Sequence, residues 1–191
     1  YKYAVAPNLG FVYPTFKNVT NIDEAFANVI DSAINWSGLK FLKLTSSNNT
    51  FQNAQLVGNI TNCEFGSDDI MNVNYNAQRL FAQMVLNGYM ANNKINSSYI
   101  ESLFDSANIK DLHAQSFIFR PISNANKMFY NLITKELKLR NTFSFKSFAT
   151  TQEMFKLINV LGIFEFRDFI FGSSQYRSGM FESMNYSSAL I

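Results

Sequence analysis

Hydrophobic residues return at intervals of three and four along much of this chain. Ile22, Phe26 and Val29 form the first such stripe, directly after Asn21, a residue type that often caps a helix N-terminus. A stripe of this spacing places its members on one face of a helix. The pattern therefore predicts a helix over residues 22–36 that buries this face.

Similar stripes recur from about residue 67 onward, each behind a capping residue. Ser98 with Glu101, and Thr150 with Glu153, have the spacing of a capping box. We expect a weak further helix at the end of the chain. The expected helices begin near Ser67, Ser98, Ser123 or Asn124, and Thr150, and those from Ser67 and Thr150 end at Gly88 and Gly162.

Other segments have the alternation or the short apolar runs that are typical of strands. Residues 39–65 suggest short strands at 40–45, 55–57 and 62–65, with a spacing too irregular to indicate a repeat. Residues 117–119 suggest a buried extended run. Over residues 137–148, a small hairpin competes with the end of the preceding helix.

The first residues predict an aromatic hairpin around a turn at residues 7–10. Such an arm could pair with the sheet edge of a neighbouring chain, although an ordinary edge hairpin on its own domain is the commoner arrangement. The candidate interaction arm comprises Tyr1, Tyr3, Phe11 and Tyr13.

Together these segments predict an α+β fold, with short N-terminal strands or a hairpin and a mainly helical C-terminal two-thirds. No convincing linker divides the chain, so we expect a single domain over residues 1–191. Within it, residues 1–16 form a candidate aromatic arm and residues 172–191 a loosely structured tail. Because the chain does not begin with Met, we expect a processed product or part of something longer.

Composition points towards contact with other macromolecules. Hydrophobic residues make up 47% of the chain and include 20 Phe, whereas charged residues make up only 16%. A surface with so little charge exposes apolar patches, which often mark partner contacts. AT-rich codon usage would give the same bias. No apolar run approaches the roughly 18 residues of a spanning helix, so we expect no membrane span.

The residue types that usually carry catalysis are scarce. His113 is the single histidine and Cys63 the single cysteine, and no glycine-rich phosphate loop is present. We interpret His113 as a structural residue and Cys63 as a packing residue. The chain is therefore expected to be no enzyme, with no cofactor and no metal site.

A basic segment interleaved with aromatic residues occupies residues 120–146. Cations beside stacking rings often hold single-stranded nucleic acid, although a solvated face over core aromatics explains the same pattern and is favoured. The candidate nucleic-acid-binding residues are Arg120, Lys127, Lys135, Lys138, Arg140 and Lys146.

Asn-X-Ser/Thr triplets offer a third interpretation, a glycosylated surface domain. With so many Asn, Ser and Thr, several triplets arise by chance, and we prefer a setting in a virion or intracellular assembly over a secreted one. The triplets begin at Asn18, Asn35, Asn48, Asn59, Asn96 and Asn185.

These features favour a non-catalytic structural or assembly subunit of a large complex, with homo- or hetero-oligomeric protein partners. Within this class the composition favours a viral structural protein of the capsid, nucleocapsid or tail type. The alternatives are a nucleic-acid-binding or ribosomal or organellar component that uses residues 120–146, and an N-glycosylated surface binding domain.

Overall fold

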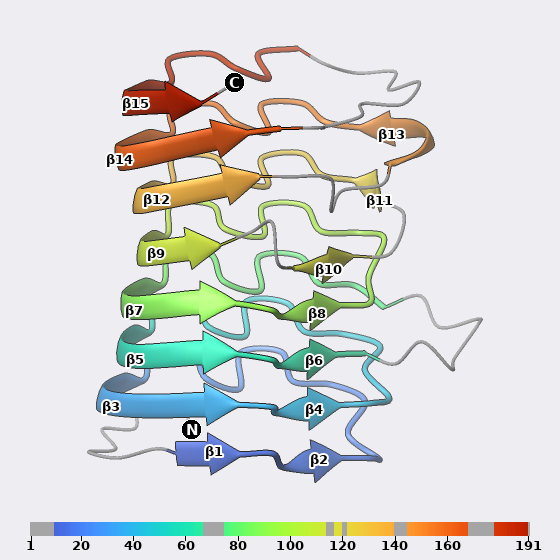
Figure 1. The fold of residues 1–191 in the computed structure, drawn as a ribbon. Helices are drawn as coiled ribbons and strands as arrows, with labels where there is room; N and C mark the ends of the chain where they lie inside the picture. Colours follow the sequence, from blue (N-terminus) through green and yellow to red (C-terminus); the bar gives the residue numbers. More distant parts are fainter. Residues whose placement is uncertain are drawn as a thin grey trace.

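The computed structural model shows a parallel β-solenoid (Figure 1). It describes residues 10–66, 75–113, 117–119, 122–139, 145–167 and 178–190, and these contain strands and turns but no helix. The chain winds in successive coils, and every strand pairing in the described residues is parallel.

The largest sheet has eight strands, one from each coil, stacked in the order of the sequence (Figure 1). Its strands are β1 (Gly10–Val12), β3 (Ile30–Ser37), β5 (Gln55–Thr61), β7 (Val85–Ala91), β9 (Asn108–His113), β12 (Ile133–Leu139), β14 (Asn159–Phe166) and β15 (Asn185–Leu190).

Two smaller sheets continue the coils beyond the long strands. Five short strands stack as a second sheet and two more form a third. The second sheet contains β2 (Thr15–Phe16), β4 (Lys40–Phe41), β6 (Glu64–Phe65), β8 (Lys94–Ile95) and β10 (Ile118–Phe119); the third contains β11 (Ile122–Asn124) and β13 (Phe145–Thr150).

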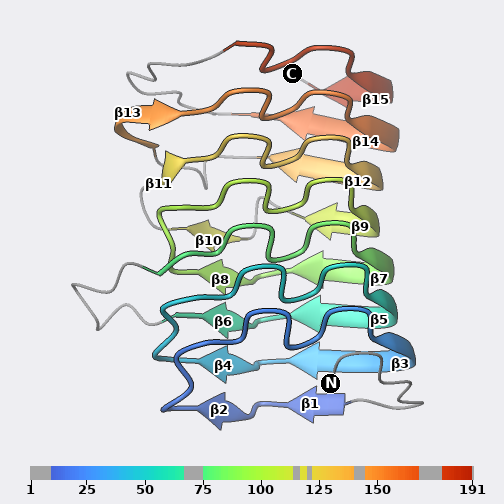
Figure 2. The same cartoon turned by 180° about the vertical axis from the view of Figure 1, so that it is seen from behind.

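A return segment of turns closes each coil and leads back to the next long strand (Figure 2). Each of these return segments has a phenylalanine at its centre, and successive phenylalanines are 23 to 30 residues apart. We call this row the phenylalanine ladder; its members are Phe26, Phe51, Phe81, Phe104, Phe129, Phe155 and Phe181.

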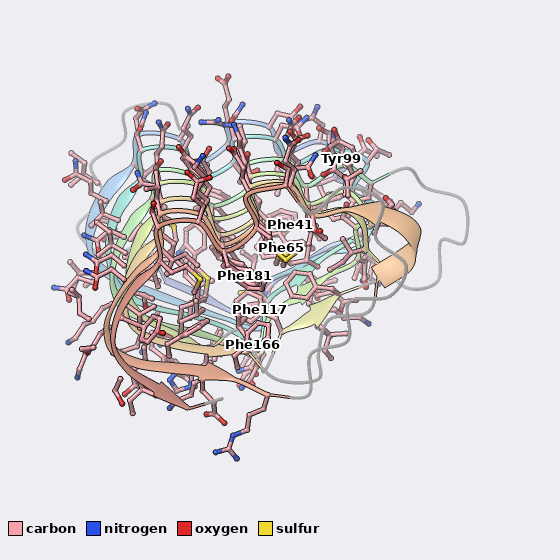
Figure 3. The ribbon with its side chains drawn as sticks, turned by 90° about the horizontal axis from the view of Figure 1, so that it is seen from above. Phe41, Phe65, Tyr99, Phe117, Phe166 and Phe181 are labelled. Atoms are coloured by element: carbon pink, nitrogen blue, oxygen red, sulfur yellow. The ribbon has the colours of Figure 1, made fainter. Side chains whose placement is uncertain are left out.

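The ladder forms a continuous aromatic stack through the interior. Each ring stacks on the next, with centroids 5.3–5.5 Å apart and planes inclined by 24° or less. Other aromatic residues, including Phe41, Phe65 and Phe117, lie beside it inside the coils (Figure 3). Stacked aromatic pairs contribute about 0.5–1.5 kcal/mol each beyond the burial of their area.

The backbone around each ladder phenylalanine follows one conformation. The residues two before and two after it have φ between +50° and +63° in every coil. Each ladder N–H except that of Phe181 donates to a carbonyl of the next coil at 2.8–3.0 Å, as Phe26 does to Thr50. Asn occupies four of these left-handed positions, which fits its tolerance for this region.

The predicted mainly helical C-terminal two-thirds is wrong, and so is the helix over residues 22–36. Around each ladder phenylalanine from Phe26 to Phe155, the residues four before and three after it are buried, as Ile22 and Val29 are around Phe26. This spacing is the same as that of a buried helix face, but alternating left- and right-handed turns produce it here. The polar caps close turns instead: Asn21 Oδ1 accepts the Asp23 N–H at 2.7 Å.

Several short strand predictions are confirmed. β4, β5, β6 and β10 lie within or overlap the segments expected at residues 40–45, 55–57, 62–65 and 117–119. The judgement that the spacing excludes a repeat is wrong, because coils of unequal length still stack in register. The hairpin considered over residues 137–148 is also wrong, since β12 and β13 belong to different sheets.

The two ends of the chain are described in part. Tyr1 and Tyr3 lie outside the described residues, whereas Phe11 lies in β1, which pairs in parallel with β3 of the same chain. Tyr13 is exposed, and its N–H donates to the Ser37 carbonyl at 2.8 Å. A contact of this arm with another chain remains a prediction. In the expected tail, residues 178–183 form a turn and β15 extends the main sheet.

Candidate binding surface

The outer face of the eight-stranded sheet carries six exposed aliphatic side chains. In a sheet with one buried face, the outward positions are usually polar. Here half of the large hydrophobic residues that are exposed in the described part of the chain lie at outward positions of this sheet. They are Ile30, Val57, Val85, Ile133, Leu161 and Ile163, with exposed fractions between 36% and 62%.

The strand register arranges these outward residues in rows across the coils. One row contains the first residue of each long strand, four positions after the ladder phenylalanine. The next row lies six positions after it and includes Val57, Lys110, Lys135 and Leu161. Since every coil presents the same offsets, residues far apart in sequence form one continuous surface.

A shallow hollow lies between these two rows over β7, β9, β12 and β14. Its volume is about 290 Å³, and aliphatic side chains contribute much of its wall. The lining residues are Val85, Leu86, Asn87, Asn108, Lys110, Ile133, Thr134, Lys135 and Leu161.

Glycines at irregularities of the register permit the close strand spacing beside this hollow. The pairing of β7 with β9 shifts between Leu86 and Tyr89, at Gly88. On the other side of β7, a Cβ atom on Gly88 would lie 1.6 Å from the carbonyl oxygen of Gly58 in β5. No other residue type fits this approach without separating the strands.

Lys110 and Lys135 line the hollow as direct neighbours across β9 and β12. The register pairs Asn108 with Ile133 and Asp111 with Glu136, which places the two lysines opposite each other. We call them the lysine pair. Neither has an ion-pair partner among the described residues, whereas seven other described cations lie 2.9–3.8 Å from a carboxylate oxygen.

A polar network borders the lysine pair on the same face. The Tyr89 hydroxyl lies 3.2 Å from His113 Nδ1, and His113 Nε2 lies 3.5 Å from Glu136 Oε2. Lys138 Nζ lies 2.9 Å from the same carboxylate oxygen. The Lys138 hydrogen bond, together with the nearby positive charges, holds the pKa of Glu136 below its usual value despite partial burial.

The side chains of this network contact one another at a partly exposed surface. Within the described ranges, no three His, Cys, Asp or Glu side chains gather to hold a metal ion. Cys63 is buried, and burial raises the pKa of its thiol to about 11, which keeps the thiol protonated.

The structure does not gather the described members of the predicted basic segment on one face. Lys135 and Lys138 lie on β12 in the main sheet, but Lys127 lies in a return segment behind it (Figure 2). Lys127 Nζ is 3.6 Å from Glu153 and 5.4 Å from the Tyr130 ring centre. Lys146 belongs to β13, and the structure describes its backbone but not its side chain. Arg120 and Arg140 lie outside the described residues.

The Asn residues of the six glycosylation triplets differ in their exposure. Among the glycosylation triplets, Asn96 is buried and its Nδ2 donates to the Gly66 carbonyl at 2.6 Å, so it cannot carry a glycan in the folded protein. Asn48 is half-buried. The four exposed triplet residues are Asn18, Asn35, Asn59 and Asn185.

Sequence reasoning missed Tyr89, Lys110 and Leu161 as members of this surface. For Lys110 and Leu161, the signal that could have found them is a shared offset from the phenylalanine ladder, which becomes visible only once the ladder is recognised. Lys110 follows Phe104 by six residues, just as Leu161 follows Phe155.

The described part of the chain contains no helix that could cross a membrane. No family model, no curated protein and no solved structure matches this sequence. The properties of the surface itself are therefore the basis for a functional proposal.

Proposed function

We propose that this chain is a non-catalytic interaction subunit that binds a protein partner across the outer face of its eight-stranded sheet. The observation that carries the proposal is the set of six exposed aliphatic residues on that face. Along the first row these residues alternate with Gln55, Asn108 and Asn159, so the face combines apolar and polar groups. Exposed apolar side chains gathered on one face often mark a contact with another macromolecule. A solenoid suits this role because stacked coils present one extended, regular surface.

The polar residues on the face favour a specific contact over nonspecific hydrophobic association. Tyr89, His113, Glu136 and Lys138 form a fixed network beside the aliphatic rows. Protein interfaces combine apolar centres with such polar and charged surroundings, which set the orientation of the partner. The viral form of this proposal has only the composition to support it.

The nucleic-acid alternative receives less support from the geometry. Lys127 is separated from Lys135 and Lys138 and is engaged with Glu153. A nucleic-acid groove needs several cations along one path together with exposed rings for base stacking. The described residues that line the hollow include no aromatic ring.

Site-specific photo-crosslinking in the cells that produce the protein tests the proposal. A benzophenone amino acid at Val57 or at Leu161 should give discrete adducts with the same protein, because both positions lie on the proposed contact face. Adducts between two copies of this chain would identify the partner as a second subunit. Mass spectrometry identifies each adduct.

The matched control is the same amino acid at Gln152, an exposed position in a return segment. It should give no discrete adduct. Equal adducts from all three positions, or none from Val57 and Leu161, would contradict the proposed function.

A further inference from the structure

We propose that the hollow over β7, β9, β12 and β14 binds the carboxylate of an Asp or Glu side chain in an extended segment of the protein partner. This inference rests on the proposed function and adds the chemical class of the group that the surface recognises. The lysine pair and the aliphatic wall of the hollow carry it independently of each other.

The lysine pair places two positive charges side by side with no direct ion-pair partner among the described residues. Like charges directly opposite each other on neighbouring strands destabilise a sheet. At most other described cations an adjacent carboxylate offsets such repulsion, but Lys110 and Lys135 have no carboxylate within ion-pair distance among the described residues. A single incoming carboxylate, with two oxygens, can accept hydrogen bonds from both ammonium groups.

Two acids lie on the same face beside the lysine pair, Asp111 and Glu136, which the register places opposite each other. Among the described residues, neither forms an ion pair with either of these two lysines. Glu136 accepts from Lys138 at 2.9 Å and lies 3.5 Å from His113, so it acts on Lys135 only through a longer-range charge interaction. The network therefore leaves the lysine pair available. It also places the Glu136 carboxylate beside the hollow, and the repulsion between like charges disfavours the binding of more than one anion there.

The walls of the hollow restrict the ligand further. Val85, Ile133 and Leu161 are exposed and flank the lysine pair. These side chains favour a carboxylate with aliphatic groups on either side, because burying apolar surface adds to the attraction between charges. An extended peptide meets this demand when Val or Ile lies two residues before and two after the acid, on the same side of the backbone.

A pair of matched peptides tests the inference with the full chain. The first is acetyl-Val-Ser-Glu-Ser-Val-amide and the second has Gln in place of Glu. Titration at low salt, followed by NMR, should show the Glu peptide binding at least about ten times more tightly than the Gln peptide, and losing affinity as salt rises. The shifted resonances should belong to β7, β9, β12 and β14.

Variants of the chain locate the effect. Lys110→Gln and Lys135→Gln should each weaken binding of the Glu peptide by about tenfold, whereas Lys127→Gln, outside this face, should leave it unchanged. Lys135→Glu should in turn prefer a peptide with Lys in place of its Glu. Thermal melts of each variant verify that the fold is intact.

Three results would overturn the inference: equal binding of the two peptides, full binding by Lys110→Gln and Lys135→Gln, or preferential binding of a ten-residue oligothymidylate at the hollow. If crosslinks at Val57 and Leu161 persist while the peptide fails, only this inference is wrong. Absence of those crosslinks instead contradicts the proposed function.

Discussion

Replacing Phe104 with alanine is expected to cost about 3–5 kcal/mol of unfolding free energy, the range for a large aromatic residue removed from a core. Its ring is fully buried and stacks on both sides, on Phe81 at 5.4 Å and on Phe129 at 5.5 Å. Each coil contacts mainly its neighbours in a solenoid, so a cavity at the centre also weakens the coupling between its two halves. Denaturant unfolding followed by circular dichroism measures the loss.

The matched control is Phe181→Ala at the last ring of the ladder. Phe181 is 49% exposed and stacks on one ladder ring, Phe155, at 5.3 Å. Its replacement should cost about 1–2 kcal/mol, in line with partial burial. Equal losses for the two variants would show that the ladder is not a continuous buried stack.

Replacing Gly88 with alanine should have a comparable effect through the backbone. The added Cβ would lie 1.6 Å from the Gly58 carbonyl oxygen, so β5 and β7 must separate. We expect a loss on the order of 4 kcal/mol or more, the size that marks a severe steric conflict. Thermal and denaturant unfolding of the purified variant measure it.

Gly179→Ala separates this steric effect from the general loss of a glycine. Gly179 has φ of +63°, and its added Cβ would lie 3.1 Å from a flexible side-chain atom, Glu182 Oε2. The cost should be about 1 kcal/mol, the usual penalty for a non-glycine residue in the left-handed region. Were Gly88→Ala no worse than Gly179→Ala, the close strand approach at Gly88 would be disproved.

Local sequence patterns predicted some of the strands but misidentified the return segments. β5 and β6 follow from short apolar runs between polar turns. Around Phe129, by contrast, Ala125 and Leu132 are buried at the spacing of a helix face. Hydrophobic periodicity over ten residues cannot distinguish a helix from a turn that buries the same positions. A stretch this short is therefore not enough to identify a helix.

The information that distinguishes the two is non-local. The left-handed positions beside each ladder phenylalanine include Asn28, Asn49, Asn53 and Asn131, and a helix interior disfavours Asn in this way. The recurrence of phenylalanine every 23 to 30 residues is the stronger signal. Variation in coil length obscures this signal, because the interval between ladder phenylalanines changes from one coil to the next.

The binding surface could be predicted only in part for the same reason. The sequence predicted Lys135 and Lys138 as binding residues because they belong to a basic segment that also contains Lys127. The fold separates Lys127 from them and instead places Lys110, from another coil, beside Lys135. A run in sequence becomes a patch only when the fold is known.

Spin-label distances along one outward row test the central claim most directly, namely that the coils stack in parallel register and present a single outer face. Ile30, Ile133, Asn159 and Asn185 occupy equivalent positions in four coils. With one label at residue 30, the distances to labels at 133, 159 and 185 should increase by about 4.8 Å per coil, giving about 19, 24 and 29 Å. Distances without this constant increment would contradict the stacked solenoid and the surface derived from it.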